Sequence, residues 1–283
     1  SYSGTTWNYN TAFTVGSGGG AGGSIQLHAN VIKGQAAVQT NGGDGGYGAG
    51  AGSGGRIALH AAVNASWNLA IESTGGESYN TLLAGGSAGT IYRSIASRTY
   101  LQINNQDRDY VAADLYTPYP DELQVVTAAL TQFDISQAAH VEVTDTQSVF
   151  AHVMKLHQTS DLHGNAMQLI VQDLTLQGAV DVDTSLTIRS LSADAGSDPL
   201  PNTKRQMTID QASVVTVPTI DVEVTDSNFT LADGGQLDAS STPLKLECVG
   251  MPCAMDLSGS VDCSASSCAT SVIAVDGSID VSG

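Results

Sequence analysis

The sequence predicts an all-β protein built as a parallel β-solenoid, in its right-handed β-helix form. Three observations predict it: an internal repeat of about 33 residues, short segments in which apolar and polar residues alternate, and a composition that favours strands. Charged residues make up only 13% of the chain, while Gly, Ser, Thr, Ala, Val and Asp are plentiful. The right hand follows because crossovers between parallel strands have it in almost every case. A β-sandwich is the alternative, but it does not readily explain the repeat.

The repeat is clearest in the first third of the chain. It runs through three similar segments: AGGSIQLHA (21–29), SGGRIALHA (53–61) and SAGTIYRSI (87–95). Between them lie VQTNGG (38–43) and IESTGG (71–76), which are related by nearly the same offset. Because glycine reaches positive φ without a Cβ clash, we expect these glycines to be corner and packing residues of stacked coils. A nucleotide-binding loop would instead need a helix after it, and a P-loop also a Gly-Lys-Ser/Thr run, which these tracts lack.

A second phrase, strand then tight corner then strand, recurs later in the chain. It appears as ISQAAHVEV (135–143), LQGAVDV (176–182), IDQASVVTV (209–217), LSGSVDC (257–263) and VDGSIDV (275–281). Alternation predicts one inward and one outward row of side chains. The inward row includes Val180, Val182, Leu186 and Ile188, and the outward row Asp181, Asp183 and Thr187. The segment 121–133 has apolar residues at near-helical spacing, but a strand through LQVVTA is the favoured interpretation.

Charge is distributed unevenly along the chain, whose net charge is −18. Through residue 100 there are four Lys/Arg and three Asp/Glu, and afterwards six and twenty-five, so the two parts carry +1 and −19. With the cysteines, this divides the chain into glycine-rich coils (1–100), an acidic solenoid (101–245) and cysteine-containing coils (246–283). Such acidity excludes nucleic acid and an anionic membrane as partners. No run of about 18 apolar residues suggests a membrane-spanning helix.

The four cysteines and two sequons predict an extracellular glycoprotein. Cys248, Cys253, Cys263 and Cys268 follow the pattern C-x4-C-x9-C-x4-C, which fits disulfides better than a zinc site. We expect Cys248 to pair with Cys253 and Cys263 with Cys268, although the spacing also permits pairing between successive turns of chain. Disulfides imply an oxidising compartment. Asn64 and Asn228 each begin an N-glycosylation sequon.

No catalytic, cofactor or metal site is expected. His28 and His60 occupy equivalent repeat positions, with Ser94 in the third, so a stacking or solvent-facing role is favoured over metal binding. His152, His157, Asp161 and His163 match no metal motif. Acidic side chains could form a glycosidase-like or lyase-like cluster on a loop, at Asp107, Asp109, Asp114, Asp121 and Glu122. Strand-borne Asp181, Asp183, Asp221 and Glu223 fit a solubilising role, and weak Ca²⁺ binding by stacked outward Asp is the one cofactor left open.

The segments GGGAGGSIQLHA, VQTNGGDGGYGAGAGSGGRIALHA, MDLSGSVDCSASS and IAVDGSIDVSG resemble the glycine-rich repeats of large extracellular proteins of algae, stramenopiles and other protists. Among these are sexually induced, mastigoneme-type surface proteins. The resemblance covers residues 16–95 and 246–283, and it implies a structural glycoprotein of flagellar hairs or the cell surface with no catalytic residues.

The sequence therefore predicts a non-enzymatic structural subunit that stacks head to tail into a filament or surface fibre. The pattern at Gly283 would be continued by Ser1 of another copy, and no polar capping helix is expected at either end. Its partners would be further copies of itself, covalent glycans and other surface polysaccharides or glycoproteins. The alternative is a carbohydrate-binding adhesin that uses Trp7, Tyr9, Tyr47 and Trp67, and a β-helical polysaccharide lyase or hydrolase comes third.

Overall fold

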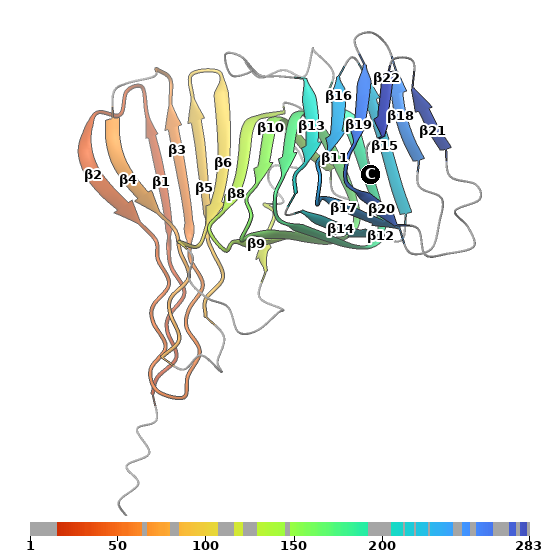
Figure 1. The fold of residues 1–283 in the computed structure, drawn as a ribbon. Helices are drawn as coiled ribbons and strands as arrows, with labels where there is room; N and C mark the ends of the chain where they lie inside the picture. Colours follow the sequence, from red (N-terminus) through yellow and green to blue (C-terminus); the bar gives the residue numbers. More distant parts are fainter. Residues whose placement is uncertain are drawn as a thin grey trace, which may run out of the picture.

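In the computed structural model, the described residues form strands and no helix (Figure 1). The described residues are 16–63, 67–79, 85–106, 116–120, 129–144, 148–191, 205–211, 213–217, 219–225, 227–239, 245–249, 253–262, 272–275 and 278–281. The protein is all-β and its strands pair mostly in parallel. Parallel pairing does not fit a β-sandwich, whose sheets are antiparallel.

The first five strands form two parallel sheets that face each other. They are β1 (Ser24–Ala29), β2 (Gly34–Gln39), β3 (Arg56–Ala61), β4 (Trp67–Glu72) and β5 (Thr90–Ile95). β1, β3 and β5 pair in register, so that Ser24, Arg56 and Thr90 lie in one row. In the second sheet, β2 pairs with β4 from Gly34 opposite Trp67 onward. These pairings join the residues that the sequence repeat aligns, so the repeated segments are confirmed as neighbouring parallel strands.

The glycine tracts form a separate element, which we call the glycine arm (residues 16–23, 40–55, 73–79 and 85–89). In Figure 1 it projects downward from the first strands. Segments that run toward the strands bond to each other at three-residue steps: Gly16 N–H to Tyr47 O (2.8 Å), Gly19 N–H to Gly50 O (3.0 Å) and Gly22 N–H to Ser53 O (2.8 Å). Segments that run outward lie between them in antiparallel contact, as shown by Gly43 N–H to Gly20 O and Gly52 N–H to Gly43 O.

The close packing of the arm explains why glycine is needed there, which the sequence alone did not predict. A three-residue period is that of the polyproline II helix, which has no internal hydrogen bonds and packs tightly only where glycine recurs. A Cβ on Gly19, Gly22 or Gly52 would meet a backbone oxygen at 1.8–2.0 Å. Of the described glycines in the arm, only Gly48 has a φ in the left-handed region, at +76°. The expected packing role is therefore confirmed, whereas the expected corner role is wrong for most of the tract.

The chain reverses after β5 and the hydrophobic core changes to the other face of the sheet. β6 (Arg98–Asn104) pairs with β5 in the one antiparallel pairing among the described strands. Ile91 packs with the first core, between the two sheets, and its neighbour Tyr92 packs against the second core. Successive strand residues point to opposite faces. The face of β5 that carries Tyr92 therefore points away from the first core and toward the second core.

The second part is a series of parallel ladders around one continuous core. It begins with β7 (Thr117–Pro118), β8 (Leu130–Ser136), β9 (His140–Val143), β10 (Ser148–Leu156), β11 (Asp161–Leu176) and β12 (Ala179–Ser190). It continues with β13 (Gln206–Ile209), β14 (Val214–Val217), β15 (Thr219–Thr225), β16 (Asn228–Leu231), β17 (Gln236–Ala239), β18 (Lys245–Val249), β19 (Ala254–Leu257), β20 (Ser260–Asp262), β21 (Val272–Val275) and β22 (Ser278–Val281). From β13 to β19, each strand pairs with the third strand after it.

The expected alternation is confirmed in β12. Val180, Val182, Leu186 and Ile188 are buried, Asp181 and Asp183 are exposed, and Thr187 is partly exposed. The helical alternative for 121–133 is wrong at its end, because Leu130 opens strand β8; residues 121–128 lie outside the described part. No helix long and apolar enough to cross a membrane occurs among the described residues.

Candidate assembly interface

The first coil is the described end of the stack, and its side chains are poorly covered. β1 pairs with β3 and β2 with β4, and in residues 16–63 and the other described ranges no strand covers their second edges. Leu27 is 39% exposed, whereas its register partner Leu59 in the next coil is fully buried. Val31, in the turn between β1 and β2, is 41% exposed. This end therefore presents an apolar surface beside unpaired strand edges.

The opposite described end consists of β20, β21 and β22. Each pairs with the strand of the preceding coil, namely β17, β18 and β19, and no later described strand pairs with them. Figure 1 shows these strands at the far side of the molecule from β1 and β2. The described part of the chain thus ends in strand edges on both sides.

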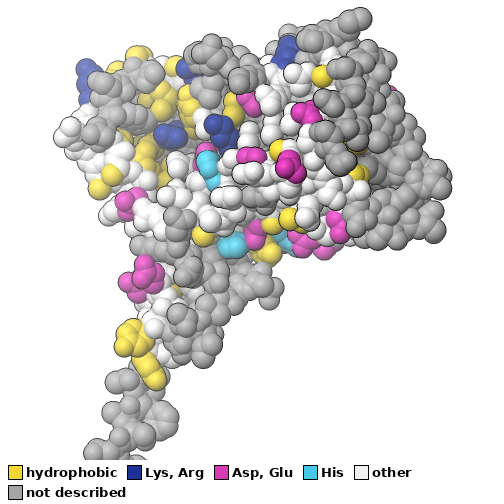
Figure 2. All heavy atoms as spheres, in the orientation of Figure 1, with side chains coloured by type: hydrophobic (Ala, Val, Ile, Leu, Met, Phe, Trp, Pro, Cys, Tyr) yellow, Lys and Arg dark blue, Asp and Glu magenta, His cyan; other side chains and the backbone are white. Residues whose placement is uncertain are grey.

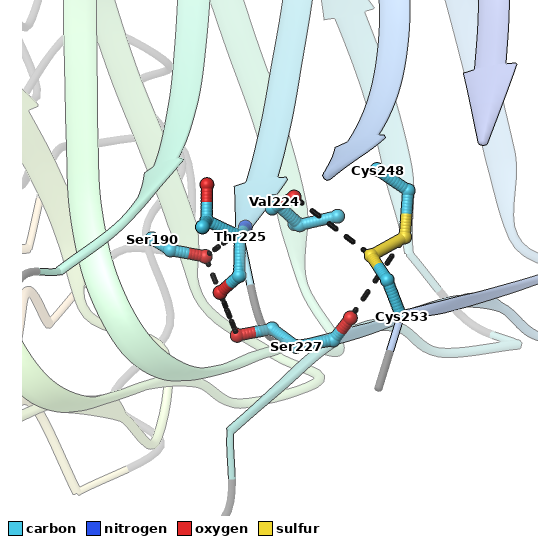
Figure 3. The surroundings of a disulfide bond; sticks show 6 residues. All are labelled: Ser190, Val224, Thr225, Ser227, Cys248 and Cys253. Carbon is cyan, nitrogen blue, oxygen red and sulfur yellow. Dashed lines mark hydrogen bonds between the residues drawn. A yellow bond between two sulfur atoms is a disulfide. The ribbon is translucent and has the colours of Figure 1, made fainter. Parts of the chain in front are cut away.

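A disulfide closes one corner near this second end. Cys248 and Cys253 are bonded and buried, at the corner between β18 and β19. Figure 3 shows them beside the corner of the preceding coil, where their sulfurs lie 3.9 Å from Ser227 O and 3.8 Å from Val224 O. Closing a loop this short stabilises the fold by about 2 kcal/mol. Cys263 and Cys268 lie outside the described residues.

The corner below the disulfide is held by hydroxyl groups. Thr225 N–H donates to Ser190 Oγ at 2.9 Å, Ser190 Oγ–H donates to Ser227 Oγ at 3.3 Å, and Ser227 Oγ–H donates to Thr225 O at 3.0 Å (Figure 3). One corner is thus held by hydroxyl hydrogen bonds and the neighbouring corner by a disulfide. Because the two occupy equivalent places, we interpret the disulfide as a structural bond.

Of the two sequons, Asn228 is described and Asn64 is not. Asn228 begins β16 with its side chain exposed, and Thr230 follows on the same outer face. A glycan at Asn228 would extend away from the core and leave the ladder undisturbed.

The histidines are distributed among separate contacts. His28 and His60 stack with ring centroids 4.1 Å apart, and Ser94 occupies the third position of that row. His152 is buried against Gln172, and His157 pairs with Asp134 at 3.3 Å. The described residues hold no group of three or more His, Cys, Asp or Glu that could bind a metal ion.

Two residues that the sequence did not single out, His140 and Tyr116, contact residues that it did. Asp161 accepts a 2.5 Å contact from His140 on the neighbouring strand, and His163 lies 4.0 Å from Asp181. Tyr116 stacks on His163 with ring centroids 4.9 Å apart. Predicting such contacts requires the register of neighbouring strands. The sequence does not give that register here, because the spacing between paired strands varies in this part of the chain.

Two basic side chains pair with three of the acidic residues on strands β15 and β18. Arg189 lies 3.5 Å from Glu223, and Lys245 lies 3.6 Å from Asp221 and 2.7 Å from Glu247. The hydrogen bond to Glu247 is the main cause that raises the pKa of Lys245. Such pairs on adjacent strands indicate a stabilising ladder. The loop candidates Asp107, Asp109, Asp114, Asp121 and Glu122 lie outside the described residues.

Of the four aromatic residues expected for an adhesin, only Tyr47 has its side chain in the described part. Trp7 and Tyr9 lie outside it, as does the side chain of Trp67. Tyr47 is 60% exposed at the end of the glycine arm, where its ring centroid is 5.7 Å from that of Tyr79. A contact of Tyr47 with Tyr79 was not predicted from the sequence, although the offset that relates β1 to β3 also relates these two tyrosines.

Comparisons of the chain with protein-family models, with curated proteins and with solved structures found no match.

Proposed function

We propose that the chain is a right-handed parallel β-solenoid that serves as a non-enzymatic, extracellular structural glycoprotein, joined end to end into a filament or surface fibre. The observation that carries the proposal is the pair of strand edges, at β1–β2 and at β20–β22, with which no further described strand pairs. An exposed strand edge offers a row of N–H and C=O groups that pairs readily with another chain. Solenoids with open ends are prone to such association unless they carry caps.

The pairing pattern supports the solenoid architecture. From β13 onward every third strand is a ladder neighbour, which is the pattern of coils with three strands each. The right hand is the one that parallel crossovers adopt in almost every case.

Strand direction supports a defined junction between copies. β1 is parallel to β3 and β5, and the reversal at β6 makes the later ladder, up to β22, antiparallel to them. A second copy related by translation would therefore place its β1 antiparallel to β22. β5 and β6 already make such a pairing over six residue pairs inside the chain.

Several features support an extracellular location. A buried disulfide fits an oxidising compartment, and Asn228 is accessible to glycosylation. Outward Asp, Ser and Thr on the shaft would keep a fibre hydrated and limit lateral aggregation. The resemblance of the repeats to mastigoneme-type surface proteins supports the same role.

The proposal is tested by comparing two lysine variants in negative-stain microscopy and light scattering. Leu27→Lys places a charge at the open edge, and Val214→Lys places the same charge on β14, in the middle of a ladder, at the same 39% exposure. We expect the wild type and Val214→Lys to form linear assemblies and Leu27→Lys to remain as single units. Discrete, non-associating wild-type particles at the highest soluble concentration would contradict the proposal.

A further inference from the structure

The end of the glycine arm presents two tyrosine side chains that lie beside each other in solvent. Tyr47 and Tyr79 are 60% and 74% exposed, and their ring centroids are 5.7 Å apart. Among the described residues, no other large apolar side chain is as exposed as these two. In Figure 2 a yellow patch lies at this end of the arm. The proposed junction between copies lies at the strand edges, so it does not use these rings.

A tight turn positions Tyr47 where the chain reverses. Ala49 N–H donates to Gly46 O at 3.0 Å, which closes a turn over Tyr47 and Gly48. Gly48 has a φ of +76°, as the third residue of a type II turn requires. Tyr47 O accepts a hydrogen bond from Gly16 N–H at 2.8 Å. The backbone of Tyr47 is therefore fixed, although its ring is exposed.

Contacts between neighbouring segments of the arm bring Tyr79 next to Tyr47. Gly45 N–H donates to Glu77 O at 2.8 Å, and Gly45 and Ser78 form a parallel bridge. Tyr79 directly follows Ser78, and Tyr47 follows Gly45 by two residues. The backbone pairing thus holds the two tyrosines close together.

The two rings are close enough to be joined by a covalent bond. Exposed side chains change rotamer within picoseconds to nanoseconds, so the rings sample many mutual orientations. A bond between carbons ortho to the two hydroxyl groups requires the centroids to approach from 5.7 Å by about one bond length. Rotation of the two exposed side chains supplies a movement of this size.

The other described tyrosines are less accessible to an oxidant in solution. All of them are buried or only partly exposed. Tyr119 is buried, and the guanidinium of Arg93 lies over the ring of Tyr100. Exposure and proximity therefore coincide at Tyr47 and Tyr79.

We propose that Tyr47 and Tyr79 form a site of oxidative cross-linking, at which hydrogen peroxide, acting through a peroxidase, joins the two rings as dityrosine. Each phenol gives up one electron and one proton, and the two radicals form a carbon–carbon bond between ortho carbons. The hydrogens of those carbons then move to the oxygens, which restores both aromatic rings. Hydrogen peroxide takes up the two electrons and two protons and becomes two water molecules.

Such a bond locks neighbouring segments of the arm together. Tyr79 follows Tyr47 by 32 residues, and a cross-link across a loop restricts the unfolded chain, as a disulfide does. The segments are otherwise joined by backbone hydrogen bonds such as Gly19 N–H to Gly50 O. The inference does not rest on filament formation.

The test is treatment of the whole chain with a haem peroxidase and hydrogen peroxide. At a chain concentration of about 1 μM, coupling within one chain is favoured, since a tethered group has an effective concentration in the millimolar range. Dityrosine fluorescence measures the yield, and denaturing electrophoresis separates single chains from linked ones. Trypsin leaves the two tyrosines on separate peptides, 34–56 and 57–93, and tandem mass spectrometry identifies the joined residues.

Three conservative variants make the test specific. Tyr47→Phe and Tyr79→Phe each keep the ring and remove the phenol. Tyr100→Phe is the matched control, because it removes a partly exposed phenol outside the arm. Circular dichroism shows whether each variant remains folded.

We expect peptides 34–56 and 57–93 to be joined through Tyr47 and Tyr79 in single chains of the wild type and of Tyr100→Phe. Tyr47→Phe and Tyr79→Phe should each lower the dityrosine fluorescence of single chains by roughly tenfold or more, because rings held together couple faster than separate ones. Absence of dityrosine from the wild type, unchanged fluorescence in either arm variant, or dityrosine found only between chains would overturn the proposal.

Discussion

At the residue scale, the repeat stacks identical side chains on neighbouring strands, so that one side chain affects the pKa of the next. His28 and His60 are register partners, with rings stacked at an interplanar angle of 8°. Burial, and secondarily the neighbouring His28, lower the pKa of His60. Protonation of His60 is therefore less favourable in the folded chain than in the unfolded chain.

This arrangement predicts a pH dependence of stability. Unfolded histidine has a pKa of about 6.5, so below that pH the unfolded chain binds the proton more readily than the folded one. The stability from this pair is fully present above about pH 6.5 and is lost as the pH falls through the lowered pKa. We expect the decrease in Tm between about pH 7.5 and about pH 5.5 to be smaller in His60→Ser than in wild type, as measured by circular dichroism.

Serine is the appropriate replacement because Ser94 occupies the same row in the third coil. His28→Ser, which removes the neighbouring ring, should reduce the decrease in the same direction. An identical decrease in wild type and His60→Ser would show that the pair does not contribute.

At the element scale, the glycine arm is stabilised by backbone hydrogen bonds between segments and not by a hydrophobic core. Its three-residue period makes adjacent glycines unequal, since one faces a neighbouring backbone and the next faces open space. A Cβ on Gly22 would lie 2.0 Å from Thr40 O, whereas a Cβ on Gly23 would meet nothing within 4 Å.

Adjacent alanine substitutions should therefore have opposite effects. Gly22→Ala forces the segments apart and weakens bonds such as Gly22 N–H to Ser53 O, each worth about 0.5 to 1.5 kcal/mol. Gly23→Ala should be neutral or stabilise by about 0.4 to 1 kcal/mol through the unfolded state. Hydrogen exchange of the arm amides measures both, and we expect faster exchange only in Gly22→Ala. Equal exchange in the two variants would contradict the packing role of Gly22.

At the scale of the whole molecule, the net negative charge opposes the association that exposed strand edges favour. Open strand edges favour association, but every unit carries a net charge of −18, so two approaching units repel. Figure 2 shows acidic side chains on the shaft and on the arm. Salt screens such long-range repulsion while leaving backbone pairing largely unaffected.

End-to-end association should therefore increase with salt. We expect light scattering of the purified chain to rise faster at about 0.15 M NaCl than at about 0.01 M, because the Debye length falls from about 30 Å to about 8 Å. Urea at the same ionic strength serves as the control, since it weakens association without screening charge. A rate that falls with added salt would indicate a junction made of opposite charges.

Much of the fold could be predicted from the sequence. The spacing of the repeated segments predicted the register of the first three coils, and alternation at 180–188 predicted which side chains are buried. Both are predictable because a strand has a two-residue period and stacked coils repeat their pattern. The surface groove across β1, β3 and β5 was less predictable, since it combines residues of these strands with Leu101 and Pro120.

By itself, the sequence determined the all-β class, the register of the repeated first strands and the inward and outward rows, because these depend on repeat spacing and on alternation along the chain. Only the tertiary structure decided three other features: the bundling of the glycines into an arm, the change of core face at β5, and the alignment of Gln26, Ala58 and Tyr92 into a groove. Each feature depends on contacts between segments that are far apart in the chain. The absence of a Cβ lets the glycine segments pack together, and the direction of the β5–β6 hairpin sets which sheet face becomes the core.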